Sequence, residues 1–378
     1  MQDRFIPAVF MRGGSSKAVV FDARDLPTDR AERDRVLLGV LGSPDPYGRQ
    51  LNGMGGGLSS VSKAVIVGPS TRPDADVDYT FAQIGIEQAA VDYGANCGNM
   101  SSAVGPFAVD AGLVRVADGD ALVRIHQTNT AKIIHARFPV AGGCAVTAGD
   151  YAIAGVAGTG ARIRLDFLDP GGAVTDGLLP TGRVADVIDA DDFGRITLSL
   201  VDASNAAAFV DAAEVGLTGR ERPEDLEGRA ALMAALDRLR RRAGVMMGLG
   251  DDPAAVGPSN PRLVIVSAPA DFQGSDGRAV AALAHDIAVR MLNMGQVHRA
   301  IALTTAMAVG VACRIEGTVA HRLARPLSPD GEIRVGSPAG VVSVGAEVHP
   351  TADGWHADSA VVYRTARTLM RGEVAVPA

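Results

Sequence analysis

A polar, glycine-bearing turn is followed by small apolar residues within residues 91–112, and this contrast is the clearest pattern in the chain. The turn carries Cys97. A segment that is apolar on every side predicts a helix buried inside its domain. Gly105-Pro106 lies in the middle of this segment, and a proline inside a helix costs about 3 kcal/mol. We therefore predict a central helix over residues 98–112 that surrounding strands hold in place.

A second segment of small apolar residues lies near the other end of the chain. It follows Asn293-Met294-Gly295 and reads QVHRAIALTTAMAVGVAC. We predict a second central helix over residues 294–312, with Met294 at the corner that corresponds to Cys97. Strand-like segments precede and follow both helices. The pattern predicts an α+β chain of two pseudo-symmetric, barrel-like domains, each wrapped around a central helix.

Glycine and proline are frequent at residues 171–182, which predicts a domain boundary near residue 185. We expect a first domain over residues 1–185 and a second over residues 186–365, with residues 366–378 returning to the first. Other helices are expected at residues 31–42, 224–243 and 276–291.

Composition narrows the class of protein. Apolar residues make up 47% of the chain, which is normal for a globular protein with a core, and the net charge of −7 argues against a general binder of nucleic acid or membrane surfaces. The three cysteines have no CxxC spacing, which predicts a reducing, cytoplasmic location and neither disulfides nor a zinc site. No signal peptide and no membrane-spanning segment is expected.

Two glycine–serine loops are typical of sites that bind anions. The first carries Ser15 and Ser16 ahead of an apolar strand, and its backbone N–H groups and hydroxyls suit an anion. The second carries Ser60 and delivers Lys63 to the start of another apolar strand. A lysine at the edge of a half-buried pocket can have its pKa lowered enough to act as a base.

A thiol at the beginning of a buried helix has two chemical advantages. The first N–H groups of the helix, at Gly98 and Asn99, can hold an anion. The positive end of the helix also favours a thiolate. Inverting a stereocentre needs an acid and a base on opposite faces, and the thioether of Met294 cannot carry a proton, so racemisation by two thiols is disfavoured.

Several blocks resemble the PrpF family, which is related to diaminopimelate epimerase and proline racemase. The resemblance spans most of the chain in the family's order. It departs at residues 336–340, where the family often has Gly-His-Pro-Ser-Gly, and at Asn205-Ala206, where it often has Asn-Pro. The blocks are RGGSSKAVVF (12–21), NGMGGGLSSVSKAVIV (52–67), VDYGANCGNMSSAVGPFAVDAGLV (91–114), DFLDPGGAVTDGLLPTG (166–182), MMGLG (246–250) and MGQVHRA (294–300).

The resemblance implies a diaminopimelate epimerase-like fold with an active site in the cleft between two domains. It implies isomerisation of small unsaturated di- or tricarboxylic acids without a cofactor, as in 2-methylaconitate isomerase, 4-oxalomesaconate tautomerase and methylitaconate isomerase. It places the catalytic lysine at Lys63 and the catalytic cysteine at Cys97. No metal ligand is expected, and the residues expected to bind the substrate are Ser15, Ser16, Ser60, Asn96, Gly98, Asn99, Met294, Gly295 and His298.

We hypothesise an allylic 1,3-proton shift, with Lys63 as the principal base and Cys97 as proton donor or second base. The alternatives are a two-base epimerase or racemase of a small amino or hydroxy acid, and a non-catalytic accessory protein of an aconitase-like dehydratase. A phenazine-biosynthesis-like isomerase shares the barrel shape but lacks the CGNM block. A homodimer and a functional pairing with the dehydratase are left open, as is the identity of the acid.

Overall fold

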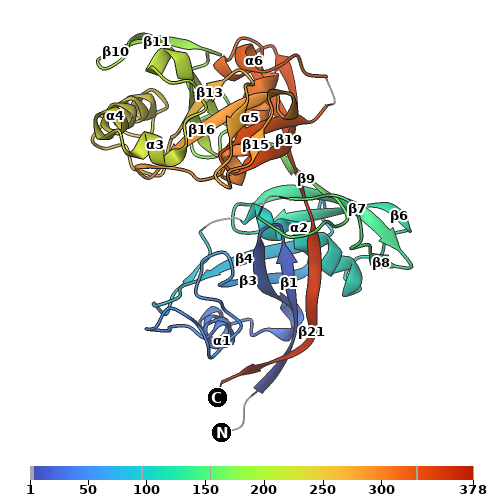
Figure 1. The fold of residues 1–378 in the computed structure, drawn as a ribbon. Helices are drawn as coiled ribbons and strands as arrows, with labels where there is room; N and C mark the ends of the chain where they lie inside the picture. The colour runs from blue at the N-terminus through green and yellow to red at the C-terminus, as the bar shows by residue number, and fades with distance from the viewer. Residues whose placement is uncertain (1–3, 95–96, 154, 329–330, 378) are drawn as a thin grey trace. The chain divides into compact units, whose positions relative to one another are not determined.

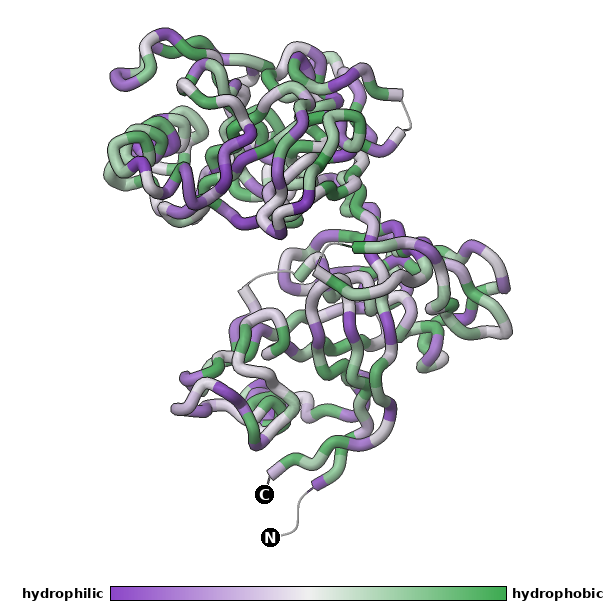
Figure 2. Tube along the Cα trace, viewed as in Figure 1, coloured by the Kyte–Doolittle hydropathy of each residue, from purple (hydrophilic) through white to green (hydrophobic). Residues whose placement is uncertain are grey.

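The computed structural model describes residues 4–94, 97–153, 155–328 and 331–377. Strands supply most of the regular structure, in agreement with the α+β class expected. The chain divides into two compact units, which we call unit 1 (residues 1–167 and 363–378) and unit 2 (residues 168–362) (Figure 1). In Figure 2, apolar stretches run through the strands and helices of each unit and are interrupted by polar residues.

Unit 1 is built on a mixed sheet. Along the sheet, β1 pairs antiparallel with β2, β2 parallel with β3, β3 antiparallel with β4, β4 parallel with β6, and β6 antiparallel with β7. The last strand, β21, returns from the C-terminal end of the chain and pairs antiparallel with β1. The strands are β1 (Arg4–Gly13), β2 (Ser16–Asp22), β3 (Lys63–Pro69), β4 (Val77–Ile84), β5 (Val91–Asp92), β6 (Gly119–Gln127), β7 (Lys132–Ala141), β8 (Cys144–Ala145), β9 (Ile163–Leu168) and β21 (Ala366–Val376).

Unit 2 repeats this pairing scheme. β11 pairs antiparallel with β12, β12 parallel with β13, β13 antiparallel with β16, β16 parallel with β18, and β18 antiparallel with β19. The repeat makes β3 of unit 1 the counterpart of β13 of unit 2, and β4 the counterpart of β16. The strands are β10 (Asp186–Ala190), β11 (Gly194–Asp202), β12 (Ala206–Asp211), β13 (Arg262–Ser267), β14 (Phe272–Gln273), β15 (Ala279–Val280), β16 (Ile287–Asn293), β17 (Gln296–Val297), β18 (Ile333–Ser337), β19 (Gly340–Thr351) and β20 (Gly354–Arg364).

Each unit contains one helix of small residues that is buried on all sides. In unit 1 this is α2, where every residue from Met100 to Val109 is buried. A Cβ at Gly105 would lie 2.6 Å from Cε1 of Phe138 on β7, so only glycine allows this close approach. The surrounding strands therefore hold the helix in place despite Pro106. The helices are α1 (Arg30–Leu41), α2 (Gly98–Asp110), α3 (Pro223–Glu227), α4 (Ala230–Met246), α5 (Leu303–Arg314) and α6 (Val319–Leu323).

Alternation along the strands separates two faces of each sheet. In unit 1, Ala64 and Ala82 pack with α1 in one hydrophobic cluster. The residues that alternate with Ala64 and Ala82 along their strands include Lys63 and Phe81. These residues therefore face the opposite side of the sheet. In unit 2, Leu263 and the residues at every second position from it along β13 pack against α4. The residues that alternate with them face the opposite side of the sheet.

The beginning of the second central helix differs from the prediction. Met294 and Gly295 have φ angles of 50° and 78° and form the turn between β16 and β17, whereas α5 begins at Leu303. The two positive φ angles suit a two-residue hairpin turn and stop a helix from starting there. The N-cap of α5 is Ala302, so Ala302 and not Met294 is the counterpart of Cys97.

Two other expectations differ from the structure. The helix predicted at residues 276–291 is replaced by β15, a short 3-10 turn and β16, because the apolar run at its end fills a position between β13 and β18 in the sheet. The chain divides before the boundary expected near residue 185. The carboxylate of Asp202 accepts hydrogen bonds from the backbone N–H groups of Val174 and Thr175, which attaches this loop to unit 2.

Candidate functional site

Lys63 is the first residue of β3 and emerges from the second glycine–serine loop. Side-chain hydrogen bonds fix this loop: Gln50 Nε2 donates to Ser62 Oγ at 2.8 Å, and Ser62 Oγ donates to the carbonyl oxygen of Ile84 at 3.0 Å. All three residues are buried. The backbone that carries Lys63 is therefore held by buried polar contacts, as a positioned catalytic group requires.

The Lys63 side chain is buried against neutral groups. It is 7% exposed, its Nζ donates to Gln83 Oε1 at 2.5 Å, and it lies 4.9 Å from the centre of the Phe81 ring. Gln83 is the antiparallel partner of Lys63 in the sheet, and its own amide donates to the carbonyl oxygen of Ser62 at 2.8 Å. Burial lowers the pKa of Lys63, and the nearby charge of a Cys97 thiolate opposes this shift by a smaller amount.

Cys97 is the N-cap residue of α2, as predicted, and its side chain makes no capping hydrogen bond. The thiol is partly buried. The backbone carbonyl oxygen of Cys97 accepts hydrogen bonds from Ser101 Oγ at 3.1 Å and from the hydroxyl of fully buried Tyr79 at 3.4 Å. These contacts fix the backbone at the start of α2. Cys97 therefore lies at the positive end of α2, close enough to Lys63 to influence the pKa of that lysine.

The first glycine–serine loop passes close to the beginning of α2. Gly14 has a φ of +53°, and a Cβ at this position would lie 2.3 Å from Asn99 Oδ1, so the loop requires glycine for both its conformation and its approach. Asn99 Nδ2 donates to Ser15 Oγ at 3.2 Å. Ser15 is exposed and Ser16 is buried. The loop and the helix therefore gather hydroxyl, amide and backbone N–H groups in one place.

Arg364, which the sequence did not suggest, fixes the orientation of the Asn99 amide. Its Nε donates to Asn99 Oδ1 at 3.1 Å, which leaves Asn99 Nδ2 to donate to Ser15. Its Nη1 donates to the carbonyl oxygen of Tyr363 at 2.8 Å. Burial lowers the pKa of Arg364. Arg364 is a positioning residue for this end of α2, and it adds a positive charge there.

The two glycine–serine loops also touch each other. The backbone N–H of Lys17 donates to the carbonyl oxygen of Ser60 at 3.0 Å. Unit 1 therefore brings together seven of the predicted site residues, whereas predicted Asn96 lies outside the described residues. The seven are Ser15, Ser16, Ser60, Lys63, Cys97, Gly98 and Asn99.

The remaining predicted site residues belong to unit 2. Met294 and Gly295 are exposed in the turn after β16, and the Met294 side chain is 62% exposed. His298 follows β17 and does not lie on a helix, which corrects the prediction of a helix over residues 294–312 that would include it. Its Nδ1 accepts a hydrogen bond from the N–H of Ala300 at 3.0 Å, so Nε2 carries the proton of the neutral ring. Burial lowers the pKa of His298.

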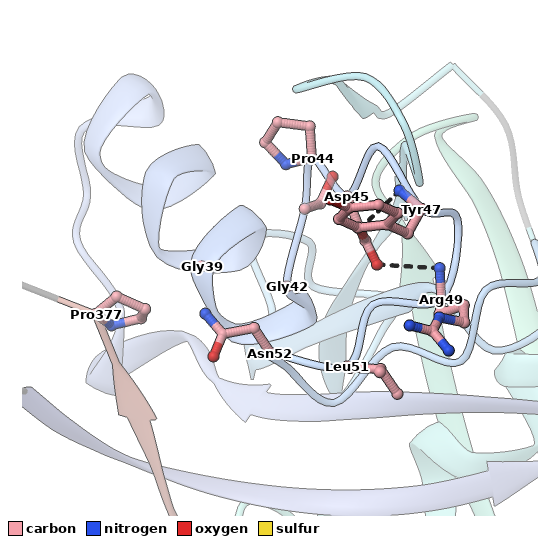
Figure 3. A pocket seen from close by; sticks show the side chains of 10 residues that line it. Gly39, Gly42, Pro44, Asp45, Tyr47, Arg49, Leu51, Asn52 and Pro377 are labelled. Carbon is pink, nitrogen blue, oxygen red and sulfur yellow. Dashed lines mark hydrogen bonds between the residues drawn. The ribbon is translucent and has the colours of Figure 1, made fainter.

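A separate pocket of unit 1 lies beside α1 (Figure 3). The Asp45 carboxylate accepts hydrogen bonds from the backbone N–H groups of Tyr47 and Arg49, which shapes the loop. The described residues that line it include none of the predicted site residues; they are Gly39, Gly42, Ser43, Pro44, Asp45, Tyr47, Arg49, Leu51, Asn52 and Pro377. In the described part of the chain, no three His, Cys, Asp or Glu side chains are grouped as a metal site would require.

Comparisons with known proteins give one consistent result. The sequence pattern of the family described as PrpF protein matches residues 3–377. The 3-methylitaconate isomerase of Eubacterium barkeri is 40% identical over 98% of this chain and 97% of its own. The 2-methyl-aconitate isomerase of Cupriavidus necator is also 40% identical, over the same shares of the two chains.

Solved structures agree with these relatives. A methylitaconate-delta-isomerase superimposes with a TM-score of 0.93 at 39% identity, covering 100% of this chain and 96% of its own. A hydroxyproline epimerase from Agrobacterium vitis has a TM-score of 0.52 at 14% identity over 99% of this chain and 94% of its own, which shows a shared fold. Among the helices of the described residues, none combines the length and apolar character needed to cross a bilayer.

Proposed function

Because the chain belongs to the PrpF family, we propose that it is a cofactor-independent isomerase that catalyses an allylic 1,3-proton shift in a small unsaturated di- or tricarboxylic acid. The relatives named for 2-methyl-aconitate and 3-methylitaconate support this class of substrate. The observation that carries the proposal is the buried Lys63, whose hydrogen-bond partner is the neutral amide of Gln83 and whose pKa is lowered by burial.

The reaction needs a base that is neutral at working pH. The surroundings of Lys63 favour this form, because burial disfavours the ammonium and the hydrogen-bond partner, Gln83, is a neutral amide. In the proposed reaction, Lys63 removes a proton from the carbon next to the double bond. A proton then returns to the carbon two positions away, from the Cys97 thiol or from the Lys63 ammonium. If the thiol donates, the Lys63 ammonium then passes its proton to the thiolate, which restores both groups for the next turnover.

The intermediate is a dienolate whose negative charge must be held. The first N–H groups of α2, at Gly98 and Asn99, have no partner within the helix and carry the positive end of its dipole. The hydroxyls of Ser15, Ser16 and Ser60 come from the two loops described above. Donors aimed at a developing anion are a large source of rate enhancement. We propose that these groups bind a substrate carboxylate and the dienolate.

A two-base epimerase would need a second acid or base at the counterpart of Cys97. That counterpart is Ala302, which has no titratable group, so this alternative is disfavoured.

We further propose that Met294, Gly295 and His298 bind the substrate. We also propose a homodimer, a cytoplasmic location and a pairing with an aconitase-like dehydratase. Sedimentation of the purified protein tests the dimer, and a pull-down with such a dehydratase tests the pairing.

An NMR screen in D₂O tests the proposed reaction. The candidate acids are 2-methylaconitate, aconitate, 4-oxalomesaconate and methylitaconate, each incubated with the full chain. We expect one acid to isomerise and to take up deuterium at an allylic carbon. Absence of both isomerisation and deuterium uptake with all four acids, using folded protein, would contradict the proposal. Deuterium uptake into an amino acid would instead support the epimerase.

A further inference from the structure

Arg262 is a half-buried arginine that has no counter-ion among the residues that the structure describes. Its Nε and Nη1 atoms are buried and have no hydrogen-bond partner. Among the described residues no carboxylate forms an ion pair with it. Leaving a charged group buried without a partner is costly, and proteins generally avoid it outside functional sites. The unmet donors of Arg262 therefore point to an anion that the free protein lacks.

The internal repeat gives Arg262 a counterpart in unit 1. Arg262 is the first residue of β13, as Lys63 is the first residue of β3. Both strands have a parallel neighbour that precedes them in the pairing scheme. On β13, Arg262 lies beside Ala207 of β12, and on β3, Ala64, the residue after Lys63, lies beside Val19 of β2. Leu263 packs in the cluster formed with α4, so Arg262 faces the opposite side of its sheet. Lys63 is placed in the same way relative to α1.

One other hydrogen-bond donor lies near Arg262. The neutral His298 presents its Nε2–H, and the nearby positive charge of Arg262 contributes to lowering the pKa of His298.

We propose that Arg262 binds a carboxylate group of the substrate, with the Nε2–H of His298 as a second donor. Unit 2 thereby supplies a carboxylate subsite of its own. The inference rests on the proposed function for the identity of the ligand, an acid with two or more carboxylates. A guanidinium binds a carboxylate through two parallel hydrogen bonds, which gives both strength and selectivity. The subsite would favour polycarboxylic acids over monocarboxylic ones.

Calorimetric titration of the full chain tests the subsite with a probe that cannot isomerise. Propane-1,2,3-tricarboxylate serves as the probe and butanoate as the monocarboxylate control. We expect the tricarboxylate to bind the unchanged protein. Arg262→Gln should raise its Kd about tenfold or more, since a hydrogen bond to a charged group contributes about that much. Arg262→Lys should restore part of the affinity.

Two controls separate binding from folding. Arg238→Gln removes an exposed arginine of α4 that pairs with Asp192, and it should leave the Kd unchanged. Thermal unfolding without ligand should give Arg262→Gln a midpoint equal to or above that of the unchanged protein, because an uncompensated buried charge is removed. A purely structural arginine would give a lower midpoint.

The inference is wrong if Arg262→Gln binds the tricarboxylate as tightly as the unchanged protein does, or if the unchanged protein does not bind it. Neither result bears on the proton-transfer chemistry, which the D₂O screen tests separately. Conversely, a loss of affinity in Arg262→Gln together with no isomerisation of any acid in that screen would support the subsite and reject the proposed function.

Discussion

Lys63 Nζ donates a hydrogen bond to Gln83 Oε1 at 2.5 Å, and the acceptor is a neutral amide where most buried lysines would require a carboxylate. A carboxylate would stabilise the ammonium form, whereas the amide leaves burial as the main influence on the pKa of Lys63. The pairing is fixed by the sheet, because Lys63 and Gln83 are directly opposite each other on β3 and β4. This contact allows a direct test of the base.

Gln83→Glu should move the acid limb of the pH profile of kcat/KM to higher pH. The new carboxylate stabilises the ammonium form and raises the pKa of Lys63, so less of the neutral amine is present at a given pH. Gln83→Leu should move the limb to lower pH, because the ammonium loses its acceptor. Two variants that leave the limb in place would show that Lys63 is not the titrating base.

Cys97→Ser should lower kcat by about 10²–10⁴-fold, which is the usual contribution of a positioned acid or base. Cys144→Ser is the matched control, because that thiol is exposed and lies outside the site. Cys313 is buried, and burial raises its pKa to about 12, so it should not react with iodoacetamide in the folded protein. Steady-state rates and mass spectrometry of the alkylated protein check both points. Full activity in Cys97→Ser would exclude the thiol from the reaction.

Gly14→Ala should remove activity and lower stability. The residue has a positive φ, and its new Cβ would collide with Asn99, displacing the amide from Ser15. Gly112→Ala is a control with φ +71° and no atom within 4 Å of the new Cβ. Strain at the backbone should cost each variant about 1–2 kcal/mol in the free energy of unfolding. Only Gly14→Ala should also lose turnover, and equal activity in the two variants would contradict the role of the loop.

Gly105→Ala tests the packing around α2. Its Cβ would lie 2.6 Å from the Phe138 ring, and such overpacking typically lowers the free energy of unfolding by about 1–3 kcal/mol. Gly257→Ala is the control, since a Cβ there meets no atom within 4 Å. Urea unfolding measures both. Phe138→Leu combined with Gly105→Ala should recover part of the lost free energy of unfolding. An unchanged free energy of unfolding in Gly105→Ala would contradict the tight packing of α2 against Phe138.

Local pattern was enough to predict the parts of the fold that local chemistry determines. The apolar run after Cys97 indicated a buried helix, and α2 begins at Gly98, directly after that residue. The glycines and serines ahead of Lys63 indicated a lysine delivered to the edge of a strand, and β3 begins at Lys63. In both cases the signal and the structure lie within a few residues of each other.

The features that the sequence did not reveal depend on distant partners. Gln83 carries no motif, and its role comes from the register of β3 against β4. Arg364 reaches Asn99 from the opposite end of the chain. The second helix begins later than predicted because the turn at Met294 is set by the pairing of β16 with β17. The small apolar residues that suggested a helix begin only at about residue 300.

Deuterium exchange by the Lys63→Met variant tests whether Lys63 is the base of the reaction. Methionine fills the buried space without charge, so circular dichroism should be unchanged. With the acid identified in the D₂O screen, the unchanged protein should incorporate deuterium at an allylic carbon at the rate of turnover. Lys63→Met should lose both exchange and turnover by about 10²–10⁴-fold. Exchange at a near-native rate in the folded Lys63→Met variant would contradict the account.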